Sequence, residues 1–113
     1  MANPSDNIVF QLIRESANSG EVPTRAEIES SLVFREDQMP VGGKHRAIDA
    51  ILSACGEAAN LHKAGNFHAA RRIAHDEHKR LSRHVDMNRS LRQVREENDP
   101  RELADELYKR FQR

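Results

Sequence analysis

Two amphipathic stretches, residues 44–64 and 67–85, limit the folds open to this chain more than any other feature. At 3.6 residues per turn, the apolar residues of each stretch fall on one stripe of a helix. The first stripe comprises Ile48, Ile51, Leu52, Cys55, Ala58 and Ala59, and the second comprises Phe67, Ala70, Ile73, Ala74, Leu81 and Val85. Gly65 suits the left-handed position that ends a helix, and Asn66 can cap the next helix. The sequence therefore predicts an all-α fold around a central antiparallel helical hairpin.

Two shorter helices are predicted before the hairpin. The first has Ser5 or Asp6 as its expected cap and ends at Gly20. Its apolar residues are Ile8, Val9, Leu12, Ile13 and Ala17. The second begins at Thr24, because Thr24 and Glu27 have the spacing of a capping box. Its buried residues are expected to be Ile28 and Leu32.

The segments that border the hairpin complete the predicted domain. Residues 35–43 contain Pro40 and Gly42-Gly43, which favour a loop. A break is expected near residues 86–88, because the apolar positions change face there. Pro100 occupies the first position of a last predicted helix over residues 100–112. We therefore expect one helical domain over residues 1–113, with four to six helices.

The composition limits the classes of function. The chain has 113 residues and no Trp. Its formal net charge is zero, which argues against non-specific binding to nucleic acid. The modest apolar content suggests a core completed by a second copy, so we expect a homodimer. A single cysteine fits a reducing compartment. We see neither a signal peptide nor a long apolar run, so we expect a cytoplasmic protein that does not enter a membrane.

Residues 8–35 resemble the first two helices of the winged helix-turn-helix domain of LexA-type repressors. The matching residues are Val9-Phe10, Leu12-Ile13-Arg14, Gly20, Pro23 to Ile28, Leu32 and Phe34-Arg35. The rest of the chain departs from that family, because no β-hairpin wing and no Ser/Lys self-cleavage domain follow. The resemblance implies a helix-turn-helix shape and, with it, binding to DNA. The candidate nucleic-acid contacts are then Arg25, Arg35, Lys44 and Arg46.

Charge is distributed unevenly along the chain. Residues 1–38 hold seven acidic and three basic side chains, whereas residues 63–95 hold nine basic and three acidic ones. On a helical wheel Arg72, Lys79 and Arg83 lie opposite the second apolar stripe. Such a face can meet a phosphate backbone or an acidic protein surface, and the neutral net charge favours the protein. The basic run contains no interleaved aromatic residues, so stacking on single-stranded nucleic acid is not expected.

Catalysis, cofactors and metals have little support in the sequence. The chain has six histidines, with His75 and His78 one helical turn apart, but no cysteine or carboxylate completes a familiar metal spacing. Cys55 lies on an apolar stripe, where a packed thiol is more common than a nucleophile. No glycine-rich phosphate loop is present. We therefore predict no enzyme activity, no cofactor and no metal.

The leading hypothesis from the sequence is a non-enzymatic regulatory protein that binds and restrains a protein partner, such as a transcription factor. The alternative is a helix-turn-helix DNA-binding regulator. Large apolar residues on two helices are the candidate anchors of a protein interface, unless they cover the central hairpin instead. These candidates are Ile8, Val9, Leu12, Leu103, Leu107, Tyr108 and Phe111.

Overall fold

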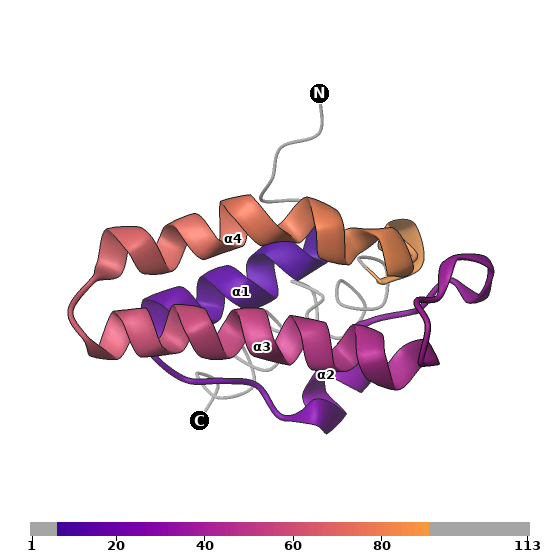
Figure 1. Cartoon of the computed structure of the whole chain (residues 1–113), viewed down its shortest axis with the longest axis horizontal. Coiled ribbons are helices and arrows are strands. Elements are labelled where there is room, and N and C mark those ends of the chain that lie inside the picture. Colours follow the sequence, from indigo (N-terminus) through magenta and orange to yellow (C-terminus); the bar gives the residue numbers. More distant parts are fainter. Residues whose placement is uncertain (1–6, 91–113) are drawn as a thin grey trace, which may run out of the picture.

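The computed structural model describes residues 7–90, which form an all-α fold (Figure 1). The helices are α1 (Ile8–Ser19), α2 (Arg25–Ser31), α3 (Gly43–Lys63) and α4 (Phe67–Leu81), and two short 3₁₀ turns are η2 (Glu36–Gln38) and η3 (Ser82–His84). Residues 87–90 are again helical. The only extended pairing within residues 7–90 is an isolated bridge between Phe34 and Val85. The predicted fold class is therefore confirmed, while the predicted helix over residues 100–112 lies outside the described residues.

The predicted hairpin is present, with α3 and α4 running antiparallel side by side (Figure 1). Gly65 makes the turn at a φ of 80°, in the left-handed region that favours glycine. Asn66 occupies the N-cap position of α4, as predicted, but its side chain makes no capping bond. Its backbone (φ −95°, ψ 66°) also departs from the extended conformation usual at that position.

Helix α1 packs against both arms of the hairpin. Its cap is Asn7 rather than the expected Ser5 or Asp6, because the Asn7 side-chain oxygen accepts hydrogen bonds from the backbone N–H groups of Val9 (2.9 Å) and Phe10 (3.1 Å). The helix ends at Gly20 as predicted, with φ at 76°. The three long helices therefore form one core.

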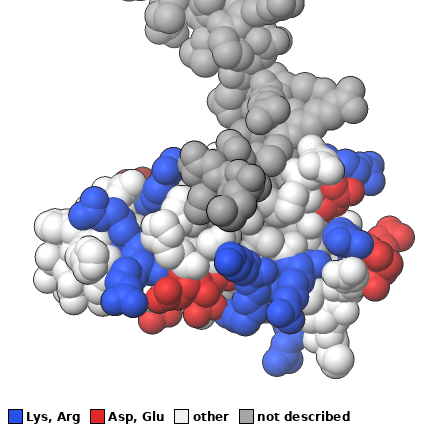
Figure 2. Space-filling view, turned by 90° about the horizontal axis from the view of Figure 1, so that it is seen from above, with Lys and Arg blue, Asp and Glu red and all other residues white. Residues whose placement is uncertain are grey.

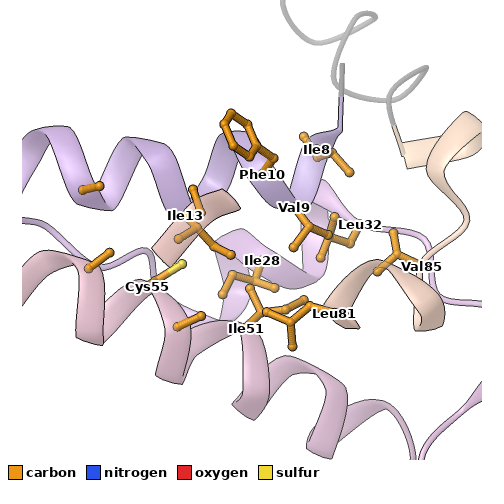
Figure 3. Close-up of a cluster of buried hydrophobic side chains, with 14 of the residues drawn as sticks. Ile8, Val9, Phe10, Ile13, Ile28, Leu32, Ile51, Cys55, Leu81 and Val85 are labelled. Atoms are coloured by element: carbon orange, nitrogen blue, oxygen red, sulfur yellow. The ribbon is translucent and has the colours of Figure 1, made fainter. Parts of the chain in front are cut away.

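Small side chains let these helices approach closely. Ala54 and Ala58 of α3 and Ala70 and Ala74 of α4 are all buried. Larger aliphatic residues fill the remaining space (Figure 3). Those that are almost completely buried are Val9, Ile13, Ile28, Ile48 and Ile51. Burying side chains of this size stabilises the fold by about 1.5–3 kcal/mol each.

The stripe predicted on α4 differs from the observed one at two positions. Phe67 is 50% exposed, because it lies at the tip of the hairpin. The buried part of its ring packs on the His62 ring. His78, which a wheel treats as polar, is buried against Phe10. The buried side of α4 is therefore shorter and more polar than predicted.

Helix α2 closes the end of the core near the start of α3. Its capping box is present as predicted, with the Glu27 N–H donating to the Thr24 hydroxyl at 3.1 Å. Ile28 is fully buried and Leu32 nearly so. After α4, the chain returns to this region, and the Asp86 N–H donates to the Val33 carbonyl at 2.7 Å. The break predicted at residues 86–88 therefore begins earlier, at the end of α4.

Two of the three candidate interface residues on α1 lie in the core, as the stated alternative expected. Ile8 is 3% exposed and Val9 is not exposed at all, because both pack into the core between α1 and the hairpin (Figure 3). Leu12 is half-buried beside them. The candidates on the predicted last helix, Leu103, Leu107, Tyr108 and Phe111, lie outside the described residues. No helix within residues 7–90 is both long enough and apolar enough to cross a membrane.

Candidate functional site

The outer face of α4 and η3 carries a row of basic side chains. Arg72, Lys79 and Arg83 are exposed and lie opposite the buried residues Ala70 and Ala74. Figure 2 shows this side of the molecule, where Lys and Arg side chains form two groups separated by acidic ones. We call the three cations the α4 basic row. They extend into the solvent because the helix buries its opposite side against α1 and α3.

The α4 basic row keeps its charges largely free. Within residues 7–90, none of the three cations forms an ion pair with a carboxylate, whereas their neighbour Arg80 pairs with Glu77. Exposed, unpaired cations keep their hydration and are available to an incoming acidic group. Exposed Asp76 lies one helical turn from both Arg72 and Lys79 on α4, so the row is not uniformly positive.

The candidate nucleic-acid contacts differ in whether they form ion pairs within the protein. Arg25 of α2 pairs with Asp49 of α3, and Lys44 of α3 pairs with Glu29 of α2 at 2.9 Å. These two ion pairs tie α2 to the start of α3. Because the Lys44 ammonium donates a hydrogen bond to the carboxylate and carries the opposite charge, the pKa of Glu29 is lowered.

The other two candidates lie nearby. Arg35 pairs with Asp37 at 3.2 Å, within the loop before α3. Arg46 is exposed, and the methylene groups of its side chain lie beside Gly42. The four cations therefore lie around α2 and the start of α3, but three of them already have carboxylate partners.

Four of the six histidines have structural contacts. The Nδ1–H groups of His62 and His78 donate to the carbonyls of Ala17 and Ala74, each at 2.9 Å. His84 bonds the Gln38 carbonyl in the same way. The His75 ring lies edge-on to Phe10 at 4.8 Å between centroids. Among residues 7–90, no three side chains of His, Cys, Asp or Glu are grouped so that they could hold a metal ion.

Cys55 is a packed thiol. It is fully buried in α3, and this burial raises its pKa. The neighbouring Ser16 hydroxyl lowers the pKa and the charge of Glu15 raises it, but both effects are smaller than that of burial. The thiol therefore stays protonated near neutral pH, which disfavours its use as a nucleophile.

Two open hollows lie on the surface of residues 7–90. One lies between α1 and α2 and is lined by Glu15, Glu21, Glu27 and several serines. The other surrounds the bridge between Phe34 and Val85. The hollows offer polar surface for contacts.

Phe67 is the feature of the surface that the sequence interpretation missed. A helical wheel places it near the apolar stripe, but a wheel does not show that the residue stands at the tip of the hairpin. Its ring is half exposed, and in sequence it lies between Lys63 and Arg71. The basic run therefore does contain an exposed aromatic residue, contrary to the prediction.

Comparison with protein-family models, with curated proteins and with solved structures finds no match for this chain.

Proposed function

We propose that this protein is a non-enzymatic regulatory module that binds a protein partner through the α4 basic row and thereby restrains it. A transcription factor is the kind of partner that we propose. The observation that carries the proposal is the contrast between two sets of cations. Arg72, Lys79 and Arg83 are exposed and unpaired within residues 7–90, whereas Arg25 and Lys44 are tied to carboxylates that join α2 to α3.

The charge of the whole molecule supports a protein rather than a nucleic acid as the partner. The net charge is zero, and the α4 face includes the carboxylate of Asp76. A phosphate backbone repels such a carboxylate along its whole length, while a protein surface can place its own cation opposite it. A mixed face of this kind therefore favours a partner with a specific pattern of charges.

The DNA-binding alternative requires the paired cations to change partners. Exposed ion pairs contribute only about 0–1 kcal/mol, so phosphates can compete for Arg25 and Lys44. Releasing them would also leave Asp49 and Glu29 beside the phosphates. The α4 basic row needs no such exchange, which is why we favour the protein partner.

We also propose that two copies associate. The candidate residues are Leu103, Leu107, Tyr108 and Phe111, since Ile8 and Val9 are buried in the core. Sedimentation of the wild type at tens of micromolar should show a dimer, and the double change Leu107→Asp with Phe111→Asp should give a monomer. A monomeric wild type would remove this part of the proposal.

Two matched triple variants test the proposed partner. One variant, Arg72→Gln with Lys79→Gln and Arg83→Gln, removes the α4 basic row. The control, Arg25→Gln with Lys44→Gln and Arg46→Gln, removes the same amount of charge from the candidate nucleic-acid contacts. Both are immobilised beside the wild type, exposed to extract of the native host, and read by quantitative mass spectrometry.

The two variants should behave differently. The proposal expects the control to keep the partner that the wild type captures, and the α4 variant to lose it. A gel-shift titration with duplex DNA at low salt accompanies the capture. Duplex binding by the wild type that is lost in the control and kept in the α4 variant would overturn the proposal in favour of DNA.

A further inference from the structure

We propose that Phe67 anchors the partner at the tip of the hairpin, and that the segment bound there carries an apolar side chain next to carboxylates. This inference rests on the proposed function and adds the chemistry of the bound segment. It draws on residues beyond the α4 basic row, so it can be tested separately.

The exposed ring of Phe67 is held in position by a neighbouring ring. Its centroid lies 4.9 Å from that of His62, with an angle of 72° between the ring planes. His62 is held in turn, because its Nδ1–H donates to the Ala17 carbonyl near the end of α1 at 2.9 Å. The other surroundings of His62 include Gly20, where an added Cβ would lie 2.8 Å from the ring carbon Cδ2. Phe67 is thus supported from α3 and α1 together.

A supported aromatic ring suits an interface anchor. Binding energy concentrates in a few large side chains, and less of it is lost when their conformation is already fixed. Two other large apolar residues are notably exposed within residues 7–90, namely Val22 at 44% and Val41 at 93%. Single exposed aliphatic residues are ordinary. Phe67 differs from them because it is aromatic and its ring has a defined support.

The charges around Phe67 define what can bind there. Residues 58–75 contain Lys63, Arg71 and Arg72, and they contain no Asp or Glu. All three cations are exposed. Arg71 is held over the same helical turn, because its Nε–H donates to the Phe67 carbonyl at 3.3 Å. Phe67 is therefore an exposed apolar residue in a segment whose Lys and Arg side chains have no carboxylate among them.

Charge complementarity then selects the occupant. A segment that buries an apolar side chain against Phe67 must place its neighbouring residues beside Lys63 and Arg71. Carboxylates at those positions gain attraction, whereas Lys or Arg would be repelled. Basic or uncharged segments are therefore disfavoured, and an acidic segment with a Leu, Phe or Trp side chain is the expected ligand.

Selection from a random peptide library tests the inference even while the partner is unidentified. The full chain is used to select phage-displayed peptides of random sequence, and the enriched peptides are then made with a fluorescent label. Anisotropy titrations compare the wild type with Phe67→Ser, with Lys63→Gln plus Arg71→Gln, and with the control Val41→Ser. Circular dichroism checks that each variant keeps its helices.

The inference predicts acidic peptides that contain an apolar residue. Their affinity should fall about tenfold or more for Phe67→Ser, as for a typical anchor. It should fall severalfold for the Lys63 and Arg71 variant, and it should stay unchanged for Val41→Ser.

Other outcomes would overturn it. Peptides without acidic and apolar residues, equal binding to Phe67→Ser, or no enrichment at all would each remove the anchor. The capture experiment with host extract and the Arg72, Lys79 and Arg83 variant tests the proposed function by a separate measurement. Failure of the Phe67 anchor and failure of the proposed function can therefore be told apart.

Discussion

Replacing Gly20 by alanine should destabilise the protein through one identifiable contact. Gly20 ends α1 at a φ of 76°, and an added Cβ would lie 2.8 Å from Cδ2 of His62. Gly65 provides the matched control, since its φ is 80° and an added Cβ would meet nothing within 4 Å. Both substitutions strain the backbone alike, and only Gly20→Ala displaces a side chain.

The magnitudes follow from these two effects. The left-handed conformation costs an alanine about 1–2 kcal/mol. Alanine also restricts the unfolded chain, which returns about 0.4–1 kcal/mol. Gly65→Ala should therefore cost about 1 kcal/mol in net free energy of unfolding. At Gly20 the methyl group must also push His62 away from Ala17, and the lost hydrogen bond adds about 0.5–1.5 kcal/mol.

Losing the edge contact between His62 and Phe67 increases the cost further, by about 0.5–1.5 kcal/mol, so Gly20→Ala should total about 2–4 kcal/mol. Urea unfolding followed by circular dichroism gives both free energies, provided that the slope with urea is unchanged. A double-mutant cycle with His62→Ala isolates the contact, because Gly20→Ala should then cost no more than Gly65→Ala. Equal costs for the two glycine substitutions in the wild-type background would refute the reasoning.

Three further predictions concern the core, the charges and the thiol. Ile51→Ala should lower the free energy of unfolding by about 2–5 kcal/mol, because it empties a fully buried site. Ile73→Ala should lower it by less, because Ile73 is only half-buried. In thermal melts, Ile51→Ala should therefore have the lower melting temperature of the two variants. The lowered pKa of Glu29 means that its ion pair with Lys44 stabilises the fold above about pH 4.5 and is lost as the pH falls through the lowered value. Melting temperatures should therefore separate the wild type from Glu29→Gln at pH 7 and converge in acid, and a constant gap would contradict this. Cys55 should react slowly with Ellman's reagent in native buffer and rapidly in urea, whereas equal rates would show that the thiol is accessible.

The hairpin could be predicted from the sequence because its apolar period extends over many turns. Ile48, Ile51 and Cys55 of α3 were assigned to the core, and all three are buried. The ends of helices were less predictable. Residues 5–7 are Ser, Asp and Asn, which are all favourable N-cap residues. Sequence alone therefore could not identify Asn7 as the residue whose side chain caps α1.

Errors within the stripes came from information that a helical wheel lacks. A wheel gives the direction of a side chain and says nothing about how far the neighbouring helix extends. Phe67 therefore looked like a core residue, although it lies at the exposed tip of the hairpin. Similarly, His78 was not assigned to the core, because its burial depends on Phe10 from α1 and on a bond to the Ala74 carbonyl.

The candidate site shows the same limit. The α4 basic row follows from helical spacing, since Arg72, Lys79 and Arg83 are close in sequence and lie on one face. The pairing of Arg25 with Asp49 joins different helices, so it depends on how α2 packs on α3. Sequence spacing alone therefore could not show which cations the fold leaves unpaired.

Chemical footprinting of lysines in the complex with the captured partner tests the central proposal most directly. Lys63 and Lys79 lie on the hairpin side that we propose to bind, and Lys44 lies beside α2, so one acetylation experiment reports on both surfaces. The proposal predicts that partner binding strongly slows acetylation of Lys79 and Lys63 and leaves Lys44 unchanged. Protection of Lys44 with full reactivity at Lys79 would contradict it and would place the interface on α2 and the start of α3.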